Sequence, residues 1–465
     1  MASLRVFKHY VTSHSMVLFA GDVLILSASV FIGHWMQFFG PPAIWLGEPP
    51  ALPKVAGFVM VGIVTFYIAG LYDRDPQVGH KELAARGMAA AAGWAILFAS
   101  FVFSFPSLGL SRPDAFLGIG IGSLGIIVMR WLVWFHTVIA RFRERVLFLG
   151  ATPLVERLIS EMEATNPGYE ILGYVDDRPA HEVRLTNGFR VLGKTQQLRE
   201  IVSRNQAGTI VVSLGERRGV FPMEAILDCK LQGVRIEDWP TFYEKLTGRI
   251  VVQDLRPSWL IFSEGFSRTR ITRLIKRALD ISLSSLFLGL GWPVFVLTAI
   301  AIKLDSHGPA FFRQERVGER GRIFSLLKFR TMVEGAEAVS GPVWATEEDP
   351  RITRVGRWLR KTRLDEFPQI INVLKGEMSF IGPRPERPHF VAQLQERIPY
   401  YAQRHTVTPG ITGWAQVRYH YGATIRDAEE KLQYDLYYIK NMSLFLDILI
   451  LLSSIQVVLC GRGAR

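Results

Sequence analysis

Four apolar segments fill the first 140 residues, and they constrain the fold more than any other feature of the sequence. They span 16–39, 53–72, 86–106 and 115–139. Each approaches the roughly 20 residues that an α-helix needs to cross a bilayer. Basic residues precede the first segment, separate the second from the third and follow the fourth, whereas the other two loops hold only Lys54 and Arg112 as cations. The positive-inside rule therefore predicts a four-helix transmembrane bundle over residues 1–140, with both ends in the cytoplasm.

Two ionisable residues, Asp22 and His34, fall inside the first predicted membrane helix. Ionisable groups within a membrane often serve a function. We interpret both as structural, because each can pair with another polar group inside a four-helix bundle or approach the membrane surface.

The composition limits the partners of the chain. A net charge of +12 suits an anionic partner, such as lipid headgroups or a nucleotide diphosphate. Nucleic acid is not an expected partner, because the basic residues flank apolar segments and form no recognisable nucleic-acid-binding motif. The two cysteines, Cys229 and Cys460, cannot make a metal site by themselves, and they favour a reducing, cytoplasmic setting.

After Arg145 the pattern changes to short β-branched runs that alternate with helical stretches. The predicted strands are 146–149, 170–175, 208–212 and 234–237, and the predicted helices lie near 153–164, 195–204 and 222–232. This alternation predicts a Rossmann-like cytoplasmic domain with a parallel sheet over residues 145–240. Its first turn has one glycine, Gly150, where a dinucleotide fingerprint needs three, although Asp176 and Asp177 stand near the distance expected for a ribose-binding acid. We therefore favour a role in regulation or assembly over NAD binding.

A predicted linker over residues 241–272 leads to a fifth apolar segment, within about 276–304. Basic clusters stand on both sides of it, so a full crossing would leave one cluster on the wrong side of the membrane. Pro293 lies mid-segment, where proline removes a backbone hydrogen bond and bends a helix. These features predict a re-entrant helical hairpin that enters and leaves on the cytoplasmic face, with a kinked spanning helix as the alternative.

The segment from Arg363 to Gln369 combines adjacent carboxylates, Asp365 and Glu366, with a proline suited to the first turn of a following helix. A helix start offers free N–H groups and a positive dipole end, and Arg363 adds charge, so phosphate oxygens would be stabilised where a carboxylate can reach phosphorus. We interpret the two carboxylates as an active site. The alternative is that acidic residues simply favour a helix N-terminus.

Several further motifs surround this segment. They are Gly308-Pro309-Ala310-Phe311-Phe312, Lys328-Phe329-Arg330-Thr331-Met332, Ser379-Phe380-Ile381-Gly382-Pro383-Arg384-Pro385-Glu386 and Pro409-Gly410-Ile411-Thr412-Gly413-Trp414-Ala415-Gln416. In this order and spacing they resemble the bacterial sugar transferases that prime glycan assembly on a polyprenyl phosphate, the monotopic phosphoglycosyl transferase superfamily. The resemblance covers about residues 268–465, so residues 273–465 are expected to form the catalytic domain. The preceding half resembles the four membrane helices and nucleotide-binding-like domain of larger family members, and the family implies a helix break at Trp292-Pro293.

The resemblance implies that Asp365 is a nucleophile that attacks the sugar-bearing phosphate of a UDP-sugar, releases UMP and holds the phosphosugar as an acyl phosphate. Polyprenyl phosphate then attacks this intermediate, which splits one difficult transfer into two. Glu366 would act as a metal partner or receive the proton of the acceptor. Mg²⁺ is the expected cofactor, held by Asp365 and Glu366, because it binds through one or two carboxylates plus substrate phosphates.

Basic residues supply the expected substrate contacts. Lys328 and Arg330 lie on a predicted strand whose alternation turns both to one face, as a clamp on a diphosphate requires. Arg363 adds charge beside the dyad, and Arg384, held between two prolines, would position a guanidinium for phosphate or uridine recognition. An exposed basic strand face and a rigid surface turn are the respective structural alternatives.

The mouth of the predicted hairpin carries Lys276, Arg277 and Asp280, and Pro293 marks its break. Basic groups at membrane level suit the head of a polyprenyl phosphate, but anchoring to anionic lipids would need the same cations. A last apolar stretch, 443–460, is interrupted by polar residues and is expected to lie on the membrane.

The expected fold class is α/β with membrane helices: a transmembrane bundle, a Rossmann-like domain, and a re-entrant hairpin with an α/β catalytic domain. The expected function is transfer of a hexose 1-phosphate from a UDP-sugar to undecaprenyl phosphate at the bacterial inner membrane, which primes exopolysaccharide, capsule or O-antigen synthesis. The extra domains favour a homodimer. One alternative is a membrane-anchored nucleotide-sugar dehydratase, but no tyrosine has a lysine four positions later. The other is a non-enzymatic scaffold or chain-length regulator of polysaccharide export.

Overall fold

A computed structural model describes residues 3–6, 9–38, 51–72, 80–138, 144–165, 169–178, 189–214, 221–253, 263, 265–266, 269–336, 349–419, 422 and 424–459. The chain divides into two compact units. One comprises Met1–Val6 and Tyr10–Thr247, and the other comprises Phe7–His9 and Gly248–Arg465.

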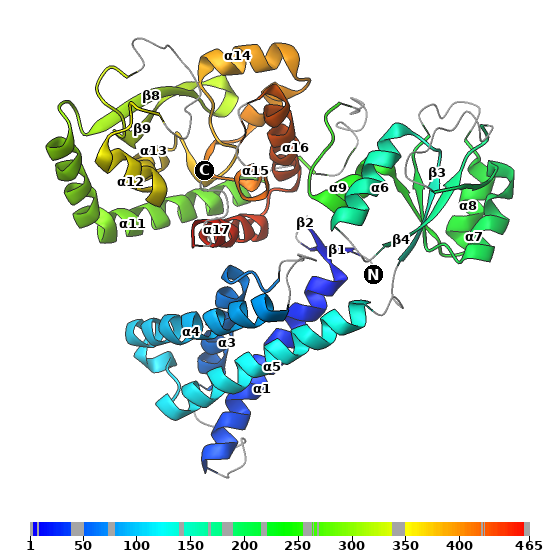
Figure 1. Cartoon of the computed structure of the whole chain (residues 1–465), viewed down its shortest axis with the longest axis horizontal. Helices are drawn as coiled ribbons and strands as arrows, with labels where there is room; N and C mark the ends of the chain where they lie inside the picture. The colour runs from blue at the N-terminus through cyan, green and yellow to red at the C-terminus, as the bar shows by residue number, and fades with distance from the viewer. Residues whose placement is uncertain are drawn as a thin grey trace. The chain divides into compact units, whose positions relative to one another are not determined.

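The first unit contains the predicted helix bundle (Figure 1). Its helices are α1 (Ser13–Phe38), α3 (Ala51–Ile68), α4 (His80–Ser104) and α5 (Arg112–Val138). Beside them are the paired strands β1 (Ser3–Val6) and β2 (His9–Thr12) and the 3-10 helix η1 (Pro106–Leu108). Apolar residues from all four helices meet in one core, where the ring centroids of Phe58 and Trp94 lie 4.5 Å apart.

Four of the described helices are long and apolar enough to cross a membrane, and three of them, α1, α4 and α5, belong to this bundle. The fourth is α11 (Arg270–Asp305) of the second unit. Helix α3 contributes a shorter apolar stretch, Leu52–Ile68. The chain is therefore a membrane protein by the length and composition of its helices.

Asp22 and His34 both have partners inside the bundle, as the sequence predicts. Nη2 of Arg130 donates to Oδ2 of Asp22 at 2.6 Å, and the hydroxyl of Tyr72 donates to the same oxygen. Nδ1 of His34 lies 3.4 Å from a carboxylate oxygen of Asp114. Both contacts tie α1 to α5, so the two ionisable groups are explained by pairing within the bundle.

A five-stranded parallel sheet forms the rest of the first unit, with the strand order β5-β4-β3-β6-β7. The strands are β3 (Glu144–Leu149), β4 (Tyr169–Val175), β5 (Val191–Gly193), β6 (Thr209–Val212) and β7 (Arg235–Asp238). The helices are α6 (Pro153–Thr165), η2 (Thr195–Gln197), α7 (Leu198–Asn205), α8 (Met223–Leu231) and α9 (Trp239–Thr247). Numbered along the chain, this order is 3-2-1-4-5, which is the order of a Rossmann fold without its sixth strand, so the predicted fold class is confirmed. Two details differ from expectation: β5 was not predicted, and α9 occupies the start of the predicted linker.

The second unit contains the long helix α11, and a small α/β assembly follows this helix in the chain (Figure 1). Its strands are the antiparallel pair β8 (Phe311–Val317) and β9 (Ile323–Phe329) and the parallel pair β10 (Ser379–Ile381) and β11 (Gly410–Thr412). The α-helices are α12 (Arg354–Thr362), α13 (Gln369–Lys375), α14 (Pro388–Arg397), α15 (Trp414–Arg418), α16 (Ile425–Asn441) and α17 (Leu444–Leu459). The 3-10 turns are η3 (Glu319–Gly321), η4 (Leu364–Glu366) and η5 (Tyr401–Thr406).

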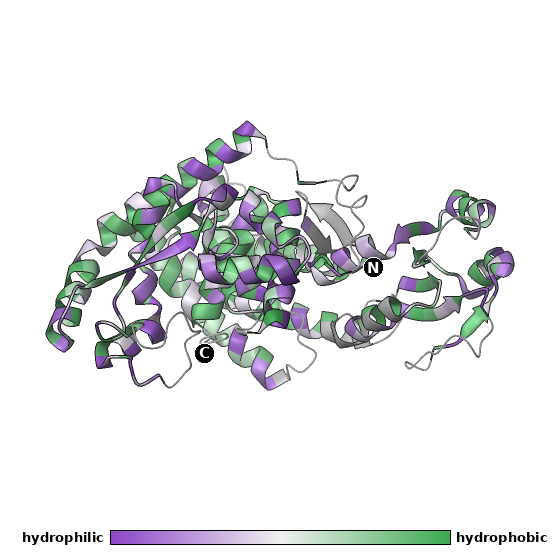
Figure 2. Cartoon of the chain, turned by 90° about the horizontal axis from the view of Figure 1, so that it is seen from above, coloured by the Kyte–Doolittle hydropathy of each residue, from purple (hydrophilic) through white to green (hydrophobic). Residues whose placement is uncertain are grey.

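Helix α11 continues through Pro293, where the sequence predicts a break. In Figures 1 and 2 the ribbon of α11, the long helix at the left, changes direction along its length, and Figure 2 shows hydrophobic residues on both sides of the bend. A proline lacks the N–H that would bond to the preceding turn, so a helix can bend there without ending. The helix is bent and unbroken, and a re-entrant path through a membrane stays a prediction.

Polar residues of α17 pair with other elements of the second unit. This pairing gives the interrupted apolar pattern of 443–460 a different cause from the predicted one. Asp447 accepts from Lys276, and the hydroxyls of Ser454 and Thr412 lie 2.7 Å apart. These side chains are polar because they pair inside the protein. The pattern therefore does not by itself place α17 on a membrane surface.

Candidate active site

The two predicted catalytic carboxylates lie on a short turn between two helices. Helix α12 ends at Thr362, its C-cap residue Arg363 adopts the left-handed conformation at φ 60°, and η4 follows at once. Left-handed backbone is unfavourable for a residue with a side chain and persists only where the surroundings enforce it. Pro368 then starts α13, as its fixed φ allows. The turn thus presents Asp365 and Glu366 between two helix ends.

Apolar residues on either side of the dyad fix this turn. Leu364 and Phe367 both pack into a cluster built around Ile302, Phe329 and Leu359. The Phe367 ring centroid lies 6.0 Å from that of Phe295 on α11. A side chain at Gly291 would collide with the same ring, since an added Cβ would lie 2.5 Å from it. The position of the dyad is therefore set by its packing against the middle of α11.

Two cations hold Glu366. Nζ of Lys328 donates to Oε1 at 3.1 Å, and Nη1 of Arg384 donates to Oε2 at 3.3 Å while its Nη2 donates to Oε1. Burial alone would raise the pKa of Glu366, but the guanidinium and the ammonium hold it far below its ordinary value. Arg363 contributes to the same lowering through its charge. Glu366 is therefore a permanent carboxylate at neutral pH.

Asp365 differs from Glu366 both in its contacts and in the direction of its pKa shift. Its side chain is buried, and no hydrogen bond or ion pair joins its carboxylate to another residue in the part of the chain that the structure describes. Burial raises the pKa of Asp365, against the opposing charge of Lys328. Its oxygens are thus desolvated, close to two cations and free to react.

The position of Lys328 depends on Asn372, which the sequence analysis did not single out. Oδ1 of Asn372 accepts from the backbone N–H of Leu327 at 3.0 Å, and its Nδ2 donates to the carbonyl of Ser325 at 2.8 Å. The amide therefore ties α13 to the edge of β9, where Lys328 begins its reach toward Glu366. A buried asparagine seven positions after Asp365 carries no local signal, because its partners come from a distant strand.

Arg330 does not join the dyad, contrary to the prediction that it and Lys328 share one face. It is buried, and its guanidinium donates to the carbonyls of Ser306 and His307 at 2.8 and 2.6 Å. These groups follow the C-terminus of α11, where carbonyls lack helical partners. Strand β9 ends at Phe329, so the alternation that places Lys328 no longer applies to Arg330. Arg330 is a structural cap in this arrangement.

The cations at the start of α11 are also engaged within the chain. Lys276 donates to Asp447 at 2.8 Å, and Arg277 donates to the carbonyls of Val373 and Leu374 at the end of α13. Asp280 accepts from Ser379 and from the N–H of Phe380. These contacts give Lys276, Arg277 and Asp280 structural roles, because they join α11 to α13, β10 and α17. Pro293 lies exposed within α11 and makes no recorded polar contact among the described residues.

The carboxylates of the dyad suit the binding of Mg²⁺ in one respect and not in another. Asp365 offers an unengaged carboxylate, and Mg²⁺ needs only one or two of these when substrate phosphates supply the rest. Both oxygens of Glu366 already accept from cations. No group of three or more His, Cys, Asp or Glu side chains suited to a metal occurs among the described residues. A metal bound by protein and substrate together is therefore compatible, and Asp365 is the better ligand.

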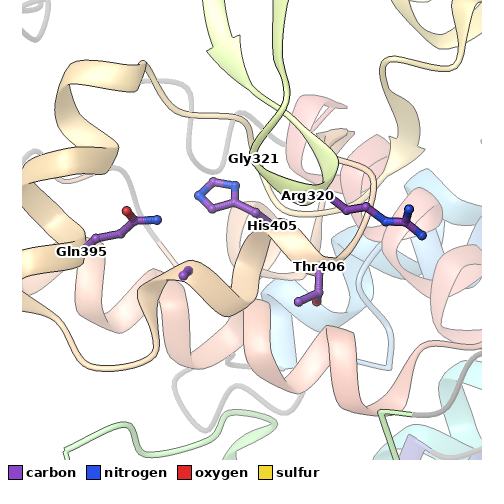
Figure 3. Close-up of a pocket in the computed structure, with 6 residues that line it drawn as sticks. Arg320, Gly321, Gln395, His405 and Thr406 are labelled. Atoms are coloured by element: carbon purple, nitrogen blue, oxygen red, sulfur yellow. The ribbon is translucent and has the colours of Figure 1, made fainter.

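Two further features, a carboxylate of the first unit and a hollow of the second, involve other residues. Asp176 accepts from the N–H of Ala151 at 2.7 Å and from the guanidinium of Arg178, so its carboxylate is used within the Rossmann-like domain. A hollow of about 420 Å³ lies beside η5 and the turn η3 (Figure 3). It is lined by Arg320, Gly321, Gln395, Ala402, His405 and Thr406. None of these residues belongs to the dyad or its cations.

Comparison with known proteins places a family model on this part of the chain. Residues 271–461 match the model described as bacterial sugar transferase. The match includes η4, β9 and the Arg384 segment, which carry the site described above.

Three characterised relatives extend the comparison. A UDP-N-acetylgalactosamine-undecaprenyl-phosphate N-acetylgalactosaminephosphotransferase of Aeromonas hydrophila is 44% identical over 237 residues, which cover 51% of this chain and 55% of that protein. A UDP-glucose:undecaprenyl-phosphate glucose-1-phosphate transferase of Xanthomonas campestris pv. campestris is 30% identical over 480 residues, covering 98% of this chain and 96% of that protein. A protein of the same description from Escherichia coli (strain K12) is 30% identical over 459 residues and 93% of each chain.

Proposed function

Because this chain belongs to the bacterial sugar transferase family, we propose that it transfers a hexose 1-phosphate from a UDP-sugar to undecaprenyl phosphate. Similar proteins are named for this type of transfer but for different sugars, glucose in two and N-acetylgalactosamine in one. The product would prime exopolysaccharide, capsule or O-antigen synthesis.

The observation that carries the proposal is the contrast between the two carboxylates. Asp365 is buried and has no polar partner among the described residues, whereas Glu366 is held by Lys328 and Arg384. A nucleophile needs a free lone pair, and a diphosphate needs oriented cations to neutralise its charge. The site provides both, because Lys328 of β9 and Arg384 meet the turn that carries Asp365 and Glu366.

The transfer would proceed in two displacements at the same phosphorus. A carboxylate oxygen of Asp365 attacks the sugar-bearing phosphorus, the bond to the bridging oxygen breaks, and UMP leaves with that oxygen. An oxygen of undecaprenyl phosphate then attacks the acyl phosphate, and the carboxylate of Asp365 is the leaving group. A phosphate monoester loses its second proton near pH 6, so the acceptor needs no strong base. The lowered pKa of Glu366 makes it a weak proton acceptor, which favours a role in holding Lys328 and Arg384.

Asp365 would hold Mg²⁺ together with the phosphates of the donor. The metal would supply further neutralisation of the diphosphate charge. Lys328 and Arg384 remain the groups of the protein that orient the phosphate oxygens.

The proposal includes the setting of the reaction. The distribution of basic residues supports an inner-membrane protein whose soluble parts face the cytoplasm, where α11 enters and leaves on one face. We include a homodimer in the proposal because the chain carries two additional parts beyond its catalytic region.

The test is UMP release by purified protein in lipid nanodiscs, with Mg²⁺, undecaprenyl phosphate and a panel of UDP-sugars that includes glucose, galactose and their N-acetylated forms. Asp365→Asn should abolish release, and Glu315→Asn, an exposed carboxylate on β8, is the matched control. Without acceptor, labelled UMP should exchange into the UDP-sugar through the covalent intermediate. Exchange that is absent in an active enzyme would contradict the two-step route. Full function of the Asp365→Asn variant would instead favour the alternative of a non-enzymatic scaffold of polysaccharide export.

A further inference from the structure

The segment that carries Arg384 is held almost entirely through its carbonyl groups. Pro383 and Pro385 lack N–H groups, so the chain here has few donors of its own. Each carbonyl from residue 383 to 386 nevertheless accepts a hydrogen bond. The donors, in order, are the N–H of Gly410 at 3.0 Å, Nη2 of Arg404 at 2.8 Å, Nη1 of Arg316 at 3.0 Å and the N–H of Val317 at 2.9 Å. The donor to Arg384 itself is thus the side chain of Arg404.

Arg404 is buried on η5 and fixed by two partners. Nη1 donates to the hydroxyl of Tyr401 at 2.5 Å, and Nη2 lies 3.0 Å from Oδ2 of Asp435 on α16. Asp435 is also buried. A buried guanidinium is stable only with its charge paired and its donors used, so removal of either partner leaves it poorly compensated. The two partners therefore determine where the guanidinium lies.

On its other side η5 packs against η3 and α14 and borders a hollow. Figure 3 shows the hollow that borders this turn, with His405 and Thr406 on one side and Gln395 across from them. A shift of η5 would move the donor that holds the Arg384 carbonyl.

We propose that the Arg404–Asp435 pair is a positioning device for the reaction, which fixes the backbone of Arg384 and so the place of its guanidinium on Glu366. Arg404 touches neither carboxylate of the dyad. Its effect passes through one carbonyl group, 2.8 Å from its Nη2, and then along a single side chain. Displacements of about 1 Å in such a positioning group can cost about a hundred-fold in rate.

A double-mutant cycle tests this route. Asp435→Asn, which keeps the shape of the side chain, should lower kcat/KM for UMP release about ten- to a hundred-fold in otherwise native protein. In an Arg384→Ala background the same substitution should change kcat/KM less than about two-fold, because the group that it positions is gone. The loss of kcat/KM should also divide between KM and kcat in the same proportion for Asp435→Asn as for Arg384→Ala.

The matched control is Arg249→Lys, which alters another ion pair of α16, between Arg249 and Glu430 at 2.7 Å. It should leave kcat/KM within about two-fold of native protein, since none of its recorded contacts reaches the Arg384 segment. Melting temperatures show whether each variant is folded. Should Asp435→Asn fail to fold, Tyr401→Phe removes the other partner of Arg404 and runs through the same cycle.

Equal losses in both backgrounds would overturn the inference, because they would show a general effect on the fold. So would a loss in the Arg249→Lys control as large as that of Asp435→Asn. The inference rests on the proposed function, since UMP release is the measurement. Native protein that releases no UMP would refute the proposed function, whereas additive losses in an active enzyme would refute only the positioning role.

Discussion

Replacing Glu366 by Gln should tighten the binding of UDP while it slows transfer. In the native site the carboxylate accepts from Lys328 and Arg384, the cations that a nucleotide diphosphate would need. It therefore competes with the phosphates for these donors and repels their charge. Glutamine keeps the shape and one accepting oxygen but removes the negative charge, so both cations become available to the ligand.

The size of the effect follows from the charges involved. The relevant charges are the carboxylate of Glu366 and a phosphate of UDP. Two unit charges about 5 Å apart repel each other by about 3 kcal/mol at an effective dielectric constant of about 20. The side chains of Lys328 and Arg384 are 21% and 34% exposed, so solvent reduces this repulsion. We expect about 1–2 kcal/mol, which is about a five- to thirty-fold lower Kd for UDP. Without the charge of Glu366, Lys328 and Arg384 would be held less firmly in place, and this should lower kcat about ten- to a hundred-fold.

Isothermal titration of UDP into nanodisc-embedded protein measures the binding, once with Mg²⁺ and once with EDTA. Glu315→Gln removes one exposed negative charge from the same unit and should leave the Kd within about two-fold. Weaker binding by Glu366→Gln in both conditions would refute the repulsion argument. Weaker binding only with Mg²⁺ would refute it differently, by showing that Glu366 is a metal ligand.

Three further outcomes follow from the geometry. Only ionised Asp365 can attack, and burial raises its pKa, so UMP release should fall as pH drops through a value above the usual aspartate pKa of about 3.9; an acid limb at or below that value in the pH–rate profile would contradict this. Asn372→Leu should cost about 1–3 kcal/mol of stability because the N–H of Leu327 loses its partner, and an unchanged melting temperature would argue against it. Gly308→Ala should cost about 1–3 kcal/mol, because φ is +110° and the new Cβ meets a guanidinium nitrogen at 2.1 Å. Gly335→Ala, also at positive φ but in open space, should cost less in the same melting experiment.

Local patterns were sufficient for the large elements of the fold. The four apolar segments and the alternation after Arg145 predict the bundle and most of the sheet, because a hydrophobic run or a repeat of buried positions lies within one element. Strand β5 (Val191–Gly193) was missed, since three residues are too few to show a period. Helix α11 was expected to break at Pro293, yet the loss of one hydrogen bond only bends it, and the packing of Gly291 against Phe367 supports the helix there.

The partners of cations were much harder to predict. Lys276 pairs with a carboxylate 171 positions away, and Arg277 donates to a carbonyl 96 positions away. A sequence shows that a basic residue is present and which face of a strand or helix it occupies, but a carbonyl from a distant element leaves no mark in the pattern. For this reason the sequence predicts a substrate contact for Arg330, which caps α11 instead, and gives no sign of the contacts of Arg404.

The fold gives two adjacent and chemically similar carboxylates opposite surroundings. Adjacent residues on a tight turn point in different directions, so Glu366 meets Lys328 and Arg384 while Asp365 does not. Environments that push two pKa values apart are the usual sign of separate roles in catalysis. The same turn is anchored by Phe367 to the middle of α11, a helix long and apolar enough to enter a bilayer. A dyad at the level of such a helix is where the phosphate of a lipid acceptor would arrive, because its tail stays in the hydrocarbon and its charge stays at the surface. In the proposed reaction, the packing of Phe367 against α11 would therefore also set the depth at which Asp365 meets the acceptor.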